Sequence, residues 1–165
     1  MARPDIHCVI HVHTHAGAAV STHKAGVLPL SQEALIRRNI LSYHDYDGIL
    51  VDEGFRNSIA KDLGPRNRLM MLHNHGLVSC GTTIEEAWNH LFDLVYACET
   101  QWRAMAAGAS NLSNLHIPSE PVQKQVFEVL TKMGGVNMDG AIKWGLGELE
   151  FEAEMRYLDY RVNIK

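Results

Sequence analysis

The stretch Val9-Ile10-His11-Val12-His13-Thr14-His15 places a histidine at every second position of an apolar run. Successive side chains of a β-strand point to opposite faces of a sheet, and β-branched residues favour that conformation. We therefore predict a strand over residues 6–12, with the odd-numbered residues from His7 to His15 on one face. Two neighbouring histidines on such a face can bind the same cation, because a zinc–imidazole bond is about 2.0–2.1 Å long.

A second histidine cluster, Leu72-His73-Asn74-His75-Gly76-Leu77, follows further along the chain. We interpret the two clusters as meeting in space around one divalent metal ion. Imidazole suits zinc, copper, iron and nickel, and three protein ligands leave a coordination position open for water or substrate. Another interpretation stays open: the chain has ten histidines, so some cluster by chance and serve as hydrogen-bonded core or surface residues.

Four segments together resemble the class II aldolase and adducin head domain family. They are residues 9–16, 29–35, 73–78 and 83–87, in this order and spacing. The similarity covers roughly residues 3–107. It implies an α/β fold with three layers, α/β/α, in which helices lie on both faces of a mostly antiparallel central sheet. We expect residues 1–165 to form one domain of this kind, with a helical extension over residues 108–165.

The resemblance also implies a metal site. In aldolases of this family the histidines that match His11, His13 and His75 bind zinc, so Zn²⁺ or another divalent transition metal is the expected cofactor. The metal acts there as a Lewis acid that stabilises the enediolate of the substrate. The implied function is a carbon–carbon lyase acting on a small hydroxy-carbonyl or sugar-phosphate compound. The resemblance assigns no role to the other histidines, although His15 can orient a ligand or the substrate.

The chain departs from the family before its first strand. Family members carry an N-terminal segment with a Gly-Asn-x-Ser-type loop that binds the substrate phosphate, and a carboxylate that serves as acid and base. This sequence starts almost at the His-x-His strand and has neither. In the matched region Glu33 is the nearest acid and Tyr43 a candidate proton donor, so both are candidate catalytic residues. Glu33 fits equally well as an acidic residue favoured at the start of a helix.

Two explanations for this departure stay open: a fragment of a longer protein, or a natural short form without the parent activity. Either one leaves a sheet edge or an apolar face to be covered. We therefore expect a homo-oligomer, and the resemblance points to a ring-like tetramer. The family also includes epimerases, dehydratases and the adducin heads. A non-catalytic interaction and oligomerisation module like the adducin head is accordingly the alternative function.

The composition excludes several classes of protein. A formal net charge of −4 and a pI near 6.2 argue against a nucleic-acid-binding protein with a basic surface. Cys8, Cys80 and Cys98 are odd in number and widely spaced, so we expect reduced core residues rather than disulfides or a thiolate metal site. The sequence shows no charged-then-apolar leader and no long apolar span, which predicts a cytoplasmic protein that does not insert into a membrane.

The remaining pattern predicts a series of helices and strands. Helices are expected over residues 16–23, 32–37, 53–63, 84–107, 122–133 and 150–161, and strands over residues 40–43, 68–72 and 77–80. Ser31 is the expected N-cap of the second helix, and Thr83 with Glu86 forms a capping-box pattern before the fourth. Residues 44–48 form a polar turn that is either solvated or in contact with substrate. Two apolar stripes are expected. The first faces a core or a subunit contact and consists of Ile84, Ala87, Trp88, Leu91, Val95, Cys98, Trp102 and Met105. The second points inward and consists of Phe151, Met155, Leu158 and Val162.

Overall fold

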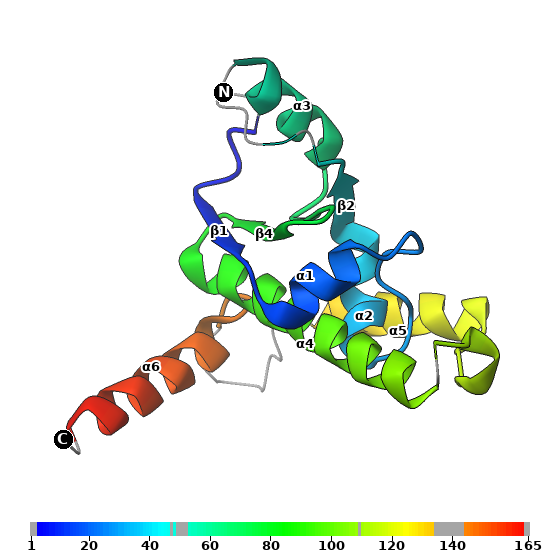
Figure 1. Ribbon diagram of the computed structural model, residues 1–165. Coiled ribbons are helices and arrows are strands. Elements are labelled where there is room, and N and C mark those ends of the chain that lie inside the picture. Colours follow the sequence, from blue (N-terminus) through cyan, green and yellow to red (C-terminus); the bar gives the residue numbers. More distant parts are fainter. Residues whose placement is uncertain (1–2, 47, 49–52, 109, 134–143, 164–165) are drawn as a thin grey trace.

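The computed structural model describes residues 3–46, 48, 53–108, 110–133 and 144–163. The Gly-rich stretch 136–149, for which the pattern predicts weak order, lies largely outside these residues. Within them, four strands form one sheet, and helices cover both of its faces (Figure 1). The expected α/β class, with helices on both faces of a central sheet, is confirmed.

The sheet has the strand order β1-β4-β3-β2. Its strands are β1 (Cys8–Val12), β2 (Leu41–His44), β3 (Leu69–Leu72) and β4 (Gly76–Gly81). β4 pairs antiparallel with both β1 and β3, while β2 runs parallel to β3, so the sheet is mostly antiparallel as expected. The turn between β3 and β4 contains Asn74 at a φ of 56°, a left-handed conformation that asparagine tolerates. Because Val12 pairs with Leu77, this turn lies beside the end of β1.

Two apolar cores lie on opposite sides of the sheet, because side chains alternate along each strand. On one side, α3 (Glu53–Leu63) covers a small cluster that includes Leu63, Met70, Leu72 and Cys80. On the other side, the larger core is enclosed by α1 (His15–Ser21), α2 (Gln32–Arg37) and α4 (Ile84–Ala107). Figure 1 shows α3 above the sheet, with α1 and α4 below it.

Two helix starts confirm the capping predictions. The Ser31 hydroxyl accepts a hydrogen bond from the Ala34 N–H, and the Thr83 hydroxyl accepts one from the Glu86 N–H. Each bond satisfies a backbone donor that has no partner inside its helix. The Glu86 carboxylate differs from the expected capping box, because it accepts from the backbone N–H and hydroxyl of Thr82 rather than from the N–H of Thr83. The bounds of α2 and α4 are those predicted.

The buried face of α4 differs from its predicted apolar stripe. Ile84 and Trp102 are 51% and 55% exposed, whereas His90 and Gln101 are buried. Gln101 is satisfied there, since its side-chain N–H donates to the Gly26 carbonyl and its side-chain oxygen accepts from the Leu28 N–H. A pattern of apolar residues misses such positions, because a polar side chain with partners is buried without a large penalty.

His90 gives this packing a measurable pH dependence. Its side chain is 3% exposed, and its Nδ1 has no hydrogen-bond partner among the described residues. Burial first, and then the charge of Arg37, lower the pKa of His90 from 6.5 to about 4. Because the folded pKa lies below the unfolded one, the unfolded chain binds the proton preferentially between those values. Folding stability should therefore fall as the pH drops from 6.5 to about 4.

We expect the substitution His90→Gln to flatten this part of the stability profile, because the variant has no imidazole to protonate. Urea unfolding at several pH values across the range measures the effect. The exposed His116 supplies the matched control, since His116→Gln should leave the profile unchanged. Parallel profiles for the wild type and H90Q would show that the burial of His90 is not the cause.

The C-terminal part of the described chain is helical, as predicted. The turn η2 (Leu112–Asn114) is followed by α5 (Glu120–Met133) and α6 (Glu148–Asn163), and η1 (Arg38–Ile40) precedes β2. The expectation that the stripe of α6 points inward is wrong beyond its first turn, because Met155, Leu158 and Val162 are 41%, 50% and 71% exposed. These side chains lie away from the two described cores, since α6 leads away from the sheet (Figure 1).

The three cysteines are free, as expected, but Cys8 is only partly buried and so is not the core residue that was expected. Cys80 and Cys98 are buried, and burial raises the pKa of the Cys98 thiol to about 12. A thiol held protonated in this way is a poor nucleophile and a poor metal ligand.

Among the described helices, none combines the length and the apolar character that crossing a membrane requires.

Candidate metal centre

Three histidine side chains from two distant segments meet at one end of the sheet. His11 lies in β1, His13 follows directly after it, and His75 lies in the turn between β3 and β4. One ring nitrogen from each lies within 4.8 Å of the other two. The ring centroids are 4.6 Å apart for His11 and His13, 5.0 Å for His11 and His75, and 4.6 Å for His13 and His75. The structure thus brings the two predicted clusters together, and we call this group the histidine triad.

The strand register explains why these side chains converge. Ile10 and Val12 pack against the larger core, so His11 between them points to the opposite face of the sheet. β1 pairs with β4 from Cys8 and Gly81 to Val12 and Leu77, which brings the end of β1 beside the turn that carries His75. A shift of one residue in this register would turn His11 into the core.

A hydrogen bond fixes the protonation of His11. Its Nδ1 lies 2.9 Å from the carbonyl oxygen of Leu77, and a carbonyl can only accept. Nδ1 therefore carries the proton, and in the neutral ring Nε2 presents its lone pair. This Nε2 lies 2.8 Å from the Nε2 of His13. A hydrogen bond to the second ring nitrogen is the usual device that orients a metal-binding histidine.

Gly76 leaves room for the triad. A Cβ atom built at this residue would lie 2.5 Å from the Val12 carbonyl oxygen and 2.8 Å from the Cδ2 of His13. Real Cβ atoms essentially never make contacts this short, so a larger residue would displace the end of β1. Gly76 thus permits the close approach of β4 to the end of β1, because it carries no side chain.

The donor set fits a divalent transition metal such as zinc. It offers three imidazole nitrogens, all accessible to solvent. Burial, followed by the charges of His11 and His13, lowers the pKa of His75, which favours the neutral ring that a metal requires. Among the described residues, no carboxylate or thiol joins the group. Three histidines would leave a coordination position for water or substrate, which is the pattern of catalytic rather than structural sites.

Tyr46 borders the triad and was not singled out by the sequence. Its ring lies edge-on to His75 with a centroid distance of 6.0 Å, and its side chain is 53% exposed. It lies two residues after the end of β2, in the segment that the sequence pattern assigns either to solvent or to substrate contact. The location beside His75 favours substrate contact for this residue.

Tyr43 occupies a different position from the one expected of a proton donor at the metal. Its ring stacks on His73 with centroids 5.6 Å apart, and its hydroxyl oxygen accepts a hydrogen bond from the Val27 N–H. Val27 is 1% exposed, so its N–H needs this partner. The contacts of Tyr43 give it a structural task, and its catalytic role stays a prediction.

We expect Tyr43→Phe to lower the free energy of unfolding by about 0.5–1.5 kcal/mol, because the buried Val27 N–H loses its acceptor. Urea denaturation measures this change. Tyr46→Phe is the matched control, since the exposed Tyr46 should tolerate the change without loss of stability. Unchanged stability in Y43F, combined with lost turnover, would instead support Tyr43 as a proton donor.

The structure places Glu33 in the first turn of α2, where it is partly buried. Its negative charge acts on Asp93 of α4 and contributes to the raised pKa of that carboxyl, for which burial is the largest cause. Glu33 is not in the group of ligand atoms around the triad. This position suits the helix-start interpretation, and its role as an acid or base stays a prediction.

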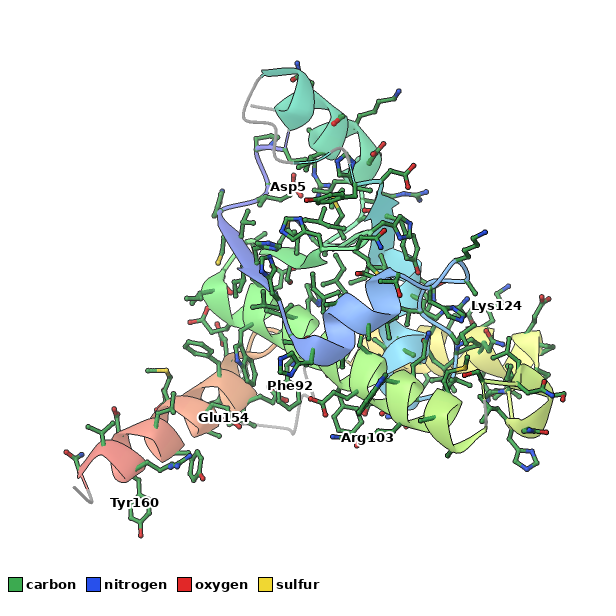
Figure 2. All side chains as sticks on the ribbon, viewed as in Figure 1. Asp5, Phe92, Arg103, Lys124, Glu154 and Tyr160 are labelled. Carbon is green, nitrogen blue, oxygen red and sulfur yellow. The ribbon has the colours of Figure 1, made fainter. Side chains whose placement is uncertain are left out.

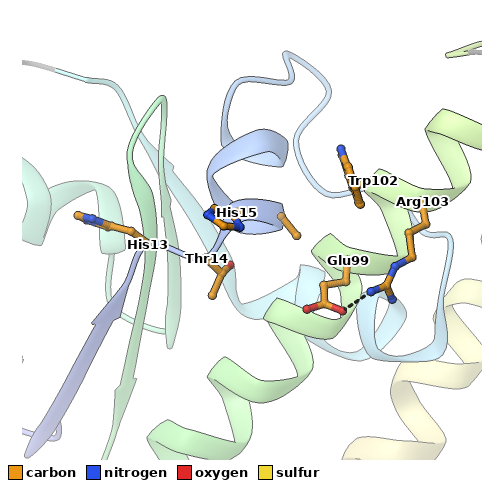
Figure 3. Close-up of a pocket in the computed structure, with 7 residues that line it drawn as sticks. His13, Thr14, His15, Glu99, Trp102 and Arg103 are labelled. Carbon is orange, nitrogen blue, oxygen red and sulfur yellow. Dashed lines mark ion pairs between the residues drawn. The ribbon is translucent and has the colours of Figure 1, made fainter.

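His15 does not share the face of His11 and His13, contrary to the strand pattern. Thr14 caps α1 by accepting the Gly17 N–H, so the strand ends and His15 begins a helix. His15 lines an open cavity of about 580 Å³ between this helix start and α4, together with Glu99, Trp102 and Arg103. His13 of the triad also lines this cavity, although in Figure 3 its ring points away from the side chains of Glu99, Trp102 and Arg103.

Comparison with known proteins adds the family context. Residues 1–102 match the family described as the class II aldolase and adducin N-terminal domain. The chain is 45% identical to human gamma-adducin over 159 residues, which is 95% of this chain and 22% of that protein. It therefore spans about a fifth of the length of this relative.

Solved structures agree with this relationship. An aldolase II superfamily protein from Pseudomonas syringae superposes with a TM-score of 0.81 at 34% identity, covering 97% of this chain and 59% of that one. An L-fuculose 1-phosphate aldolase from Glaciozyma antarctica superposes with a TM-score of 0.63 at 28% identity, covering 78% and 46% respectively. The predicted fold and the predicted family resemblance are thus confirmed.

Proposed function

The chain belongs to the class II aldolase and adducin N-terminal domain family, and from this we propose that it is a metal-dependent carbon–carbon lyase. The observation that supports the proposal is the histidine triad, in which nitrogens from two distant segments lie within 4.8 Å of one another. Its substrate class is a small hydroxy-carbonyl or sugar-phosphate compound. Epimerisation and dehydration would need the same electrophilic site, so they are reactions to test beside aldol cleavage.

His11, His13 and His75 would hold the metal, with Zn²⁺ as the first choice for three imidazoles. When bound, this ion would polarise the oxygens of a hydroxy-carbonyl substrate and stabilise the negative charge that develops on them. His11 would present the lone pair of its Nε2 to the ion, because its Nδ1–H donates to the Leu77 carbonyl oxygen.

The polypeptide would supply the proton transfer and the walls of the site. Tyr46 borders His75 and can exchange a proton through its phenol. Glu33 and Tyr43 are the acid and base candidates from the sequence, and each lies on a defined element: Glu33 in α2, Tyr43 in β2. Because the described residues contribute no carboxylate to the triad, we propose that any carboxylate that takes part comes from the substrate or from another subunit, and that Tyr46 is the candidate that borders the triad within one copy.

Metal content and turnover test the proposal. Purified protein is stripped with a chelator, titrated with Zn²⁺ by calorimetry, and assayed for aldol cleavage on a panel of sugar phosphates that includes L-fuculose 1-phosphate. Binding of one Zn²⁺ with cleavage of a panel member is the expected result. Binding without turnover would reduce the function to metal binding, and a folded protein without metal affinity would contradict the proposal.

The second candidate is a non-catalytic interaction and oligomerisation module. The 45% identity to human gamma-adducin over 95% of the chain favours it. Both candidates are compatible with a single domain over residues 1–165 that forms a homo-oligomer, and with the cytoplasm, whose reducing conditions suit three free cysteines. Size-exclusion chromatography that shows a monomer at micromolar concentration would count against the oligomer.

A further inference from the structure

The helix α6 projects from the body of the domain as an arm (Figure 1). Its first turn is anchored, because the ring of Phe151 meets the ring of Trp88 on α4 at a centroid distance of 5.8 Å. Beyond that turn, every side chain from Glu152 to Asn163 is exposed. Among the described residues, none covers this part of α6, so its surface is available to a partner.

Four apolar residues of the arm follow the spacing of a coiled-coil seam. Phe151, Met155, Leu158 and Val162 are separated by four, three and four residues, which places them on one side of the helix. Three of them are largely exposed, at 41% for Met155, 50% for Leu158 and 71% for Val162. A seam of this spacing packs against a second helix that carries the same spacing.

We propose that the arm binds the arm of a second copy of this chain in antiparallel orientation. The seam is complementary to itself in this orientation. Met155 lies opposite Leu158 of the second copy, and Phe151, which Trp88 covers only in part, lies opposite its Val162. In each half of the contact, the large side chains of Phe151 and Met155 thus face the branched side chains of Val162 and Leu158. The proposal rests on α6 alone and is independent of the metal centre.

The charges beside the seam favour this orientation. Glu154 and Arg161 flank the seam on the same side of the helix, and Figure 2 shows Glu154 projecting from the arm into solvent. In an antiparallel pair, Glu154 of one copy faces Arg161 of the other, twice by symmetry. In a parallel pair, Glu154 would instead face Asp159. On the other flank, Glu152 of one copy faces Asp159 of the other, and this like-charge contact is unfavourable. The repulsion is reduced because Glu152 already pairs with Arg156 of its own helix at 2.8 Å.

Reversal of these charges tests the orientation and the identity of the partner together. Sedimentation of the full chain at several concentrations measures the dissociation constant of the arm contact. Glu154→Arg and Arg161→Glu should each weaken association by about tenfold or more, because each creates two like-charge contacts. The double variant restores opposite charges, so its association should return to within about threefold of the wild type.

Breaking the seam supplies the second measurement. Met155→Glu should lower the average mass of the assembly at every concentration, while urea unfolding stays that of the wild type, because Met155 is exposed within one copy. Glu150→Gln is the matched control outside the seam. An unchanged mass in M155E would overturn the proposal, and so would a double charge reversal that fails to restore association.

Discussion

Replacing His75 with alanine is expected to reduce the affinity for Zn²⁺ by more than about a hundredfold, since loss of a mere supporting residue typically costs about 10–100-fold. His75 is the member of the triad that comes from the distant β3–β4 turn, within 4.8 Å of His11 and His13. Without it, two histidines from one strand end remain, and two ligands rarely hold zinc against water. Calorimetric titration of chelator-stripped protein measures the change.

His73→Ala is the matched control, because His73 lies in the same turn and stacks on Tyr43 instead of joining the triad. It should bind Zn²⁺ with an affinity close to that of the wild type. Both variants must unfold at a similar urea concentration for the comparison to count. Equal affinities of H75A and H73A would show that the second cluster contributes no ligand, and the proposed metal centre would then be wrong.

The histidine triad could be predicted from the sequence because its geometry follows from a short-range rule and a pairing. Alternation along β1 puts His11 and His13 on the same side of the chain, and Gly76 marks the close approach of β4. The bounds of helices could likewise be predicted from the sequence where an N-cap residue is present, as at Ser31 and Thr83. These features are local, so few residues decide them.

The errors arise where tertiary contacts override a local pattern. His15 was assigned to the strand face, but Thr14 caps a helix there and turns the chain. Gln101 was left out of the buried face of α4, because its two partners lie in a link far away in the sequence. Tyr46 carries no periodic signal at all, and only the position of its turn relative to His75 makes it a site residue.

The α6 stripe shows the opposite kind of error. Its spacing correctly indicates a helix with one apolar side, yet spacing says nothing about whether that side faces its own core. Met155 and Val162 are exposed because the body of the domain ends at the contact between Phe151 and Trp88. An apolar stripe that has the period of a helix but is exposed in the single chain is expected where the helix contacts another molecule.

Gly76→Ala is expected to lower the affinity for Zn²⁺ by about 10–100-fold without removing any ligand. The added methyl group would stand 2.5 Å from the Val12 carbonyl oxygen and 2.8 Å from Cδ2 of His13. Relief requires the end of β1 to move away from β4, which carries His11 and His13 away from His75. Displacements of about 0.5 Å are enough to spoil such a constellation. Zinc titration together with urea denaturation measures both consequences.

Gly64→Ala separates the loss of the site from a loss of stability. Gly64 has a φ of +67°, so alanine there strains the backbone, but a Cβ atom would meet nothing within 4 Å. This variant should unfold at a lower urea concentration and still bind Zn²⁺ as the wild type does. If G76A binds zinc normally, the triad does not depend on the contact between β1 and Gly76. If G64A loses zinc as severely as G76A, general destabilisation explains both, and the steric argument for Gly76 fails.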